Sequence, residues 1–252
     1  MTDNLLSRCN TSVWYVMELC QHGPVSEIAS ALVTRGRRLN EDQIAFIIKE
    51  TLHALIYLQQ QQILHRDVKG SNILLTADCQ VKLVDYGVSC QLAGQEDKRR
   101  SRVGTPYWMA PEVILCGDRD LQIEYDGRCD TWSLGITMIE LAQGLPPLSE
   151  LHPMRALQEI ARSPPPRLRR PEDWSLAFSD VVAACLIKDH ELRPVLVEVM
   201  EHPLFKLIPQ QPSYIQRGLN SLITWLRKDQ KSSTANQESV KISKESRQPS
   251  DK

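Results

Sequence analysis

The clearest pattern in the sequence is a run of apolar residues at helical spacing between positions 40 and 60. These residues recur every three or four positions: Ile44, Ile47, Ile48, Leu52, Leu55 and Leu58. Asn40 and Gln43 precede them with the spacing of a capping box, in which each side chain bonds to the backbone of the other residue. The pattern predicts a long amphipathic helix that starts after Asn40 and ends in the glutamine run at 59–62.

A second helix is predicted between Thr131 and Ala142, where few positions are polar. Gly144, followed by two prolines, supplies a stop signal. Because this segment leaves little polar face, it should be buried in the centre of the fold. Further helices are expected near 154–161, 176–187 and 195–201, whereas short apolar runs at 63–64, 73–75 and 81–84 predict small strands.

The two ends of the chain carry different patterns. Positions 14–17 are aromatic and β-branched and predict a strand, preceded by a truncated or non-native lead-in at 1–12. Positions 209–227 predict an amphipathic helix docked on the main domain, with an apolar face made of Ile215, Leu219, Leu222, Ile223 and Leu226. From Lys228 to Lys252 polar residues dominate and aromatic residues are lacking, so this segment is expected to be a disordered tail or linker.

Composition excludes several classes of function. The chain has 252 residues, with 30 Lys plus Arg against 31 Asp plus Glu, so no strong net field favours nucleic acid as a partner. The longest apolar stretch, at 181–187, is far shorter than the ~20 residues of a membrane helix, and no signal peptide precedes it. We therefore expect a cytoplasmic protein without a membrane span. Its seven cysteines lack Cys-x-x-Cys spacing and are expected to be reduced, structural thiols.

Three short motifs follow one another along the chain: His65-Arg66-Asp67-Val68-Lys69-Gly70-Ser71-Asn72, Asp85-Tyr86-Gly87 and Ala110-Pro111-Glu112. Each is weak evidence alone, but their ordered spacing resembles the catalytic loop and activation segment of protein kinases. In phosphoryl transfer the protein mainly positions groups and neutralises charge. Asp67 would orient the substrate hydroxyl and accept its proton, Lys69 would offset charge on the transferred group, and Asn72 with Asp85 would hold Mg²⁺.

The segment from Gly104 to Glu112 resembles the germinal-centre group of serine/threonine protein kinases. Three other stretches, Cys129–Gly135, Leu151–Leu157 and Ser163–Leu168, look most like the kinase domain of class III myosins. The resemblance covers roughly residues 13–205. It implies ATP and Mg²⁺ as cofactors and a protein as substrate, with a myosin motor and the actin cytoskeleton, or actin-rich cell protrusions, as further partner and location.

The resemblance also implies roles for residues around the nucleotide. Met17 would be the gatekeeper, and Glu18, Leu19 and Cys20 would form the hinge that bonds to adenine through its backbone. Leu74 would form the floor of the adenine pocket.

Other implied roles concern the activation segment and its support. Asp130 would hold the catalytic-loop backbone, Arg193 would pair with Glu112, and Thr105 would line the substrate loop, although a simple turn threonine before Pro106 is also compatible with the sequence.

Ser101 occupies a position where related kinases carry a phosphorylated residue, and Arg66 could receive the phosphate. An alternative stays open, in which the basic residues at 98–102 merely solvate a loop. Tyr86 departs from the usual Phe of the family. Its ring is expected to pack under His65, where a buried hydroxyl without a partner would cost about 1–3 kcal/mol.

The chain lacks other parts that a kinase needs. No lysine precedes Lys49, and the glycines before it are Gly23 and Gly36, so a Gly-rich loop and a strand lysine are missing ahead of the hinge. The expected fold is therefore mainly α: a kinase-like carboxy-terminal lobe with small β-hairpins over 13–208, and no amino-terminal lobe except the hinge strand. We expect that strand to lack sheet neighbours and the chain alone to have weak or no activity. A non-catalytic interaction or decoy module is the alternative.

Overall fold

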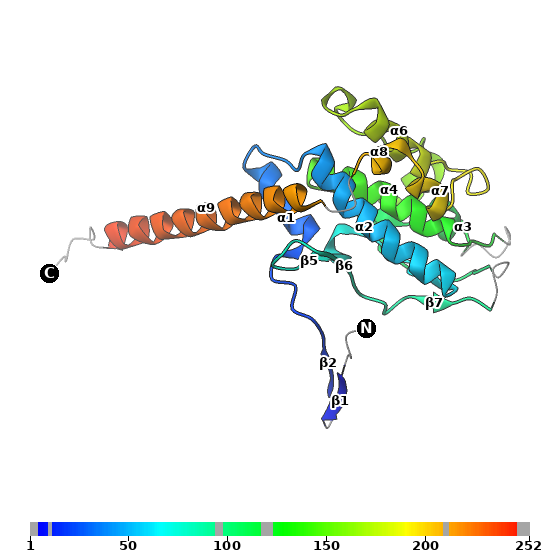
Figure 1. The fold of residues 1–252 in the computed structure, drawn as a ribbon, viewed down its shortest axis with the longest axis horizontal. Helices are drawn as coiled ribbons and strands as arrows, with labels where there is room; N and C mark the ends of the chain where they lie inside the picture. The colour runs from blue at the N-terminus through cyan, green and yellow to red at the C-terminus, as the bar shows by residue number, and fades with distance from the viewer. Residues whose placement is uncertain (1–4, 10–11, 94–97, 117–122, 209–211, 246–252) are drawn as a thin grey trace.

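The computed structural model describes residues 5–9, 12–93, 98–116, 123–208 and 212–245. Helices form the main body, while the hairpin of β1 (Leu5–Cys9) and β2 (Ser12–Val16) and the carboxy-terminal part of α9 (Ser213–Glu245) project away from it (Figure 1).

Helix α4 (Arg128–Gln143) is the centre of the fold. Every residue from Cys129 to Ala142 is buried, which confirms the prediction for this segment. The helix ends at Gly144, whose φ of +85° suits glycine, and it packs against α1 (Val25–Thr34), α2 (Glu41–Gln60) and α6 (Leu176–Cys185).

The predicted amphipathic helix is α2, and its capping box is present. The Asn40 side chain accepts a hydrogen bond from the Gln43 backbone at 2.9 Å, and the Gln43 side chain accepts one from the Asn40 backbone at 3.0 Å. The apolar residues named above are buried along the length of α2, as the spacing predicted.

Several short strands lie in the segment between α2 and α4. β5 (Ile73–Leu75) and β6 (Val81–Leu83) form a hairpin, and β3 (Gly23–Pro24) pairs with β5 on its other side. β4 (Ile63–Leu64) pairs with β7 (Cys90–Gln91). All three apolar runs that predicted strands are confirmed.

The amino-terminal strand differs from our expectation. β2 ends at Val16 rather than Met17, and it pairs antiparallel with β1, with Leu5 opposite Val16 and Cys9 opposite Ser12. The prediction that this strand lacks a neighbour is therefore wrong, because part of the supposed lead-in folds back on it. Residues 1–4 and 10–11 of that lead-in lie outside the described residues.

Helix α3 (Pro111–Leu115) precedes α4 in the chain. Helices α5 (Pro153–Arg162), α7 (Leu196–Met200) and α8 (Pro203–Lys206) follow it. Six cysteines in the described part are free, as expected of structural thiols. Among the described residues, no helix combines the length and the apolar character that crossing a bilayer requires.

Helix α9 is longer than predicted. We predicted a helix that ends at 227 and a disordered tail from 228, whereas in the structure the helix continues to Glu245. This stretch contains no Gly or Pro and is rich in Lys, Glu and Gln, whose helix propensity is high. Residues 246–252 lie outside the described part.

Candidate active site

The loop at residues 65–72, which resembles the catalytic loop of protein kinases, runs between β4 and β5 and is bonded to α4. The buried carboxylate of Asp130 accepts hydrogen bonds from the backbone N–H of His65 at 2.9 Å and of Arg66 at 2.8 Å. Arg66 has a φ of +67°, a conformation that costs energy for a residue with a Cβ. The two hydrogen bonds to Asp130 stabilise the loop in this conformation.

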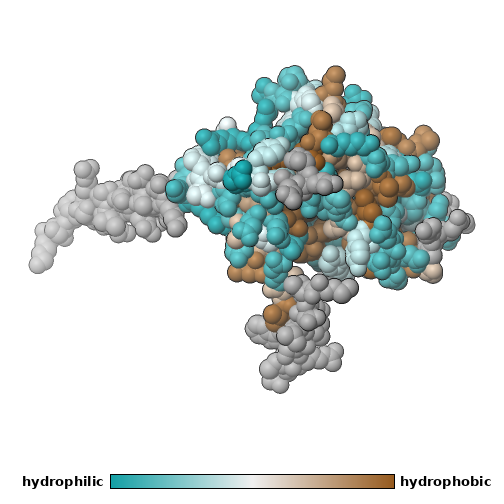
Figure 2. Space-filling model, in the orientation of Figure 1, coloured by the Kyte–Doolittle hydropathy of each residue, from teal (hydrophilic) through white to brown (hydrophobic). Residues whose placement is uncertain are grey.

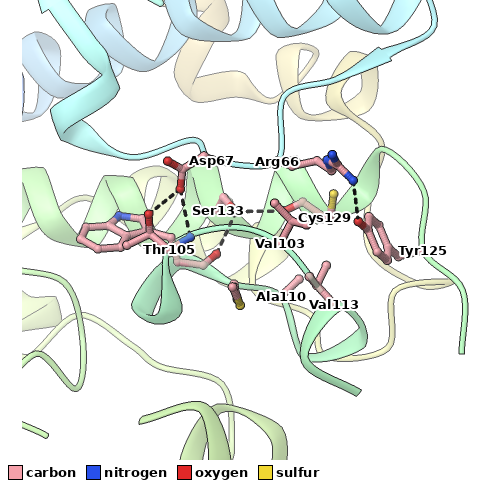
Figure 3. Close-up of a pocket in the computed structure, with 11 residues that line it drawn as sticks. Arg66, Asp67, Val103, Thr105, Ala110, Val113, Tyr125, Cys129 and Ser133 are labelled. Carbon is pink, nitrogen blue, oxygen red and sulfur yellow. Dashed lines mark hydrogen bonds between the residues drawn. The ribbon is translucent and has the colours of Figure 1, made fainter. Parts of the chain in front are cut away.

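Asp67 lies at the centre of a hydrogen-bond network, of which Figure 3 shows the part formed with Thr105. Its Oδ1 accepts bonds from the Thr105 backbone N–H at 3.0 Å and from the Thr105 hydroxyl at 2.5 Å. Its Oδ2 lies 2.7 Å from Lys69 Nζ and accepts a bond from Asn72 Nδ2 at 3.2 Å. Lys69 Nζ also donates to Thr105 Oγ1 at 2.6 Å. Four residues expected near the reacting groups therefore meet in one place.

The surroundings of Asp67 favour its charged form. Burial acts to raise its pKa, but the hydrogen bonds from Lys69 and Thr105 and the positive charge of Lys69 outweigh burial, so the pKa lies below its usual value. Asp67 is therefore a carboxylate at neutral pH. A carboxylate accepts hydrogen bonds only, so it can orient a hydroxyl donor.

Asn72 and Asp85 are brought together by the β5–β6 hairpin. The Val84 backbone N–H donates to the Asn72 carbonyl at 2.9 Å, which places Asp85, the next residue, beside this end of the hairpin. Asp85 has a φ of +68° and its exposed carboxylate accepts a bond from the Gly87 N–H at 3.2 Å.

The donor set of these two residues fits Mg²⁺. The amide nitrogen of Asn72 faces Asp67, so the amide oxygen is the atom that Asn72 would offer to a cation. Mg²⁺ prefers oxygen ligands and usually keeps several waters, so one amide oxygen and one carboxylate are compatible with it. Groups of three or more His, Cys, Asp or Glu side chains that could hold a metal are absent from the residues described.

The expected hinge lies beside the expected adenine floor. Glu18 forms an ion pair with Lys82 at 3.1 Å, and Lys82 is the partner of Leu74 across the β5–β6 hairpin. Met17 is 58% exposed and Leu19 73% exposed. Hydrophobic side chains are visible at the surface where the chain leaves the hairpin (Figure 2). The apolar side chains of Met17 and Leu19 therefore face solvent.

Ser101 lies against Arg66, as the phosphorylation hypothesis requires. Arg66 Nη1 donates to Ser101 Oγ at 2.9 Å. Tyr125, which the sequence analysis missed, donates from its hydroxyl to the Ser101 carbonyl at 2.7 Å and accepts a bond from Arg66 at 3.3 Å. Arg66 and Tyr125 face one another in Figure 3. No sequence motif marks Tyr125, because its contacts join segments distant in sequence.

Tyr86 packs against His65, with ring centroids 5.3 Å apart and an edge-on geometry. The expected cost of an unsatisfied hydroxyl does not arise. The side chain is half exposed, and its hydroxyl donates to the Leu83 carbonyl at 3.2 Å.

Glu112 and Arg193 form a buried, two-bond ion pair. Arg193 Nη1 lies 2.6 Å from Glu112 Oε1, and Nη2 lies 3.0 Å from Oε2. The side chains are 3% and 0% exposed. The pair joins α3 to the loop that follows α6.

Glu140 is a further residue that the sequence analysis missed. It is buried in α4, and its Oε2 accepts bonds from the Gly70 N–H at 2.9 Å and from the Trp108 indole N–H at 3.0 Å. A Cβ at position 70 would lie 3.0 Å from this oxygen, which explains the glycine in the catalytic loop. Glu140 therefore connects the catalytic loop to the loop that carries Thr105. The available signal was a carboxylate in a segment that leaves little polar face.

Comparison with known proteins agrees with the resemblance to protein kinases. The family described as "Protein kinase domain" matches residues 4–205, nine residues more at the amino-terminal end than we expected. Myosin-IIIa of Homo sapiens is 50% identical over 211 residues, which are 84% of this chain and 13% of that protein. Myosin-IIIb of Mus musculus is 49% identical over 194 residues, 77% of this chain and 15% of that protein.

A kinase without myosin in its name is also similar. The serine/threonine-protein kinase mig-15 of Caenorhabditis elegans is 46% identical over 199 residues, 79% of this chain and 18% of that protein. The chain therefore spans less than a fifth of the length of these relatives.

Proposed function

Because the chain belongs to the protein kinase family, we propose that it transfers a phosphoryl group from ATP to serine or threonine hydroxyls of proteins when the missing parts of the nucleotide site are supplied. The observation that carries this proposal is the network of Asp67 with Lys69, Thr105 and Asn72. It gathers a hydroxyl acceptor, a positive charge and a cation ligand in a few ångströms, as phosphoryl transfer requires.

Each residue of the network has a role in this proposal. Asp67 would hold the substrate hydroxyl and take its proton, because its lowered pKa keeps it ionised. Lys69 would offset negative charge on the transferred group. Thr105 would line the place where the hydroxyl-bearing residue sits.

The cofactors of the proposal are ATP and Mg²⁺. When bound, ATP supplies the phosphoryl group and Mg²⁺ neutralises phosphate charge. Asn72 and Asp85 would hold the cation through oxygen atoms. Adenine would lie between Leu74 and the hinge of Glu18, Leu19 and Cys20, with Met17 as gatekeeper.

Ser101 supports a regulatory step in the same proposal. Phosphorylated Ser101 would pair with Arg66, which already contacts its hydroxyl, and the added charge-assisted bonds would order the activation segment.

We assign residues 13–208 to the hinge and the carboxy-terminal lobe of the kinase domain. A Gly-rich loop and a strand lysine would have to come from outside the present sequence, so this chain alone would be weakly active or inactive. The similarity to class III myosins supports a myosin motor as a partner or substrate, and a place in the cytoplasm near actin.

A second candidate function is a non-catalytic interaction module that competes with a full kinase for partners. The exposure of Met17 and Leu19 favours it, because an apolar hinge surface of this kind is suited to contact with another protein.

The test uses a form extended upstream by a Gly-rich loop and a strand lysine. Replacing Asp67 by Asn should lower phosphoryl transfer to a protein substrate by at least ~100-fold while ATP binding is retained. The matched control is Asp78→Asn, at an exposed position of the β5–β6 turn. Equal activity of the two variants would remove Asp67 from its role, and an inactive extended parent would favour the interaction module.

A further inference from the structure

The first half of α9 is packed on the domain. Its apolar residues at 215, 219, 223 and 226 are each at most 4% exposed, and the helix contacts both α1 and α2. This spacing of three and four residues lines up one face of a helix. The apolar face therefore holds residues 213–229 against the body.

Two arginines at the end of α1 and in the turn after it contact the same half of α9. Arg35 forms an ion pair with Asp229 at 2.7 Å and also donates to the Ala31 carbonyl at 3.0 Å. The guanidinium of Arg37 lies 4.1 Å from the ring centroid of Trp225, within the range of a cation–π contact. These contacts fix the rotation of α9 as well as its position.

From this position α9 reaches the segment that directly follows the hinge. Arg227 Nη2 donates to the Gln21 carbonyl at 2.6 Å. Asn220 Nδ2 donates to the Ala77 carbonyl at 3.3 Å in the β5–β6 turn. Gln21 and His22 bond to the same turn, since the Gln21 side chain accepts from the Ala77 N–H at 2.9 Å and His22 Nε2 lies 3.0 Å from the Ala77 carbonyl.

The positive charge of Arg227 also affects His22, in the segment that directly follows the hinge. Burial lowers the pKa of His22, and the nearby positive charge of Arg227 lowers it further. This electrostatic effect agrees with the short distance between Arg227 and the Gln21 carbonyl.

We propose that residues 213–229 form a clasp that sets the position of the hinge. A displacement of the chain that follows this segment would then change the affinity for nucleotide. We call this segment the α9 clasp. The same helix continues beyond the clasp to Glu245 and projects from the body, so a displacement of its outer part is carried to Arg227 by a continuous helix (Figure 1). The effect on nucleotide rests on the proposed function, whereas the mechanical link to the hinge does not.

The mechanical link is tested in the full chain by hydrogen exchange measured by mass spectrometry. The variant is Arg227→Ala, and the matched control is Arg217→Ala, an exposed arginine ten residues earlier on the same helix. We expect exchange in residues 18–23 to rise about fivefold relative to exchange in the α4 peptides of the same protein, as suits the loss of one hydrogen bond. An unchanged ratio, or equal ratios in the two variants, would overturn the proposal. General unfolding raises exchange in all peptides alike, so a raised ratio reports on residues 18–23 alone.

The effect on nucleotide is tested in the upstream-extended form. Arg227→Ala should raise the KM for ATP by about fivefold at an unchanged kcat, because the hinge would bind adenine but not take part in the transfer step. A change in kcat at constant KM would contradict the role of the clasp. If the extended form were inactive, the proposed function would fail while the exchange experiment still decided whether the clasp holds the hinge.

Discussion

Glu140 shows how a single side chain can connect two functional loops. Its carboxyl group is buried under the catalytic loop and accepts bonds from Gly70 and Trp108. Burial raises its pKa to about 7, although these two bonds and the charge of Lys69 act in the opposite direction. The group therefore changes its charge near neutral pH, which is unusual for a glutamate.

This pKa predicts a pH-dependent stability. The folded-state pKa is raised above the ordinary value of 4.5, so the contribution of Glu140 to stability is full below pH 4.5 and is lost as pH rises through about 7. Glu140→Gln cannot titrate. Its free energy of unfolding, relative to that of the parent, should therefore increase by up to roughly 3 kcal/mol between pH 4.5 and 8.

Urea unfolding at several pH values measures this difference. The control is Glu150→Gln, at an exposed position, whose profile should run parallel to that of the parent. A Glu140→Gln profile that also runs parallel would show that Glu140 does not titrate in this range.

At this scale the sequence identifies the residues of the loops better than those that support them. Asp67, Lys69, Asn72 and Asp85 stand in local motifs, and the structure places the first three in direct contact. Tyr125 and Glu140 could not be assigned, because their contacts are formed by segments that are far apart in the chain.

Among the secondary-structure elements, the ion pair of Glu112 with Arg193 ties α3 to the loop after α6. Removing one partner would leave a buried charge without compensation, so Glu112→Ala should lower the free energy of unfolding by about 3–5 kcal/mol. The control pair, Glu201 with Lys206, is 69% and 61% exposed, and Glu201→Ala should cost at most ~1 kcal/mol. Urea unfolding would compare them, and equal losses would contradict the structural role of the buried pair.

The packing of α9 gives a second prediction for an element. Leu219 lies on the inner face of this helix and is fully buried, so Leu219→Ala should destabilise the protein by about 2–5 kcal/mol. Leu207→Ala is the control, because Leu207 is 77% exposed and its loss should change stability by less than ~0.5 kcal/mol. The same unfolding midpoint for both variants would mean that α9 does not pack as described.

The elements themselves could be predicted where a local signal exists. The capping box and apolar spacing predicted α2, and the stretch with little polar face before the Gly144 stop predicted α4. Helix α1 was missed, and the pairing of β1 with β2 was not foreseen, because pairing depends on a partner segment that we had set aside as a lead-in. The length of α9 was missed because polarity was taken as disorder although the residues favour helix.

At the scale of the whole molecule, the exposed hinge surface predicts the response to nucleotide. The purified chain of 252 residues should show no thermal shift with millimolar Mg-ATP, because the hinge and floor enclose adenine from one side. The form extended upstream should show a shift, since ligand binding to the folded state stabilises it. A clear shift of the short chain would contradict this prediction.

The bonds around Asp67 have one more consequence. Both of its oxygens already have donors in this structure, and the hydroxyl of Thr105 occupies the position next to Oδ1. An arriving alcohol would therefore exchange places with a hydroxyl of the same chemical kind, at little net energetic cost. On the proposed function, water would have to make the same exchange without other contacts to favour it, so the network would favour transfer to an alcohol over hydrolysis.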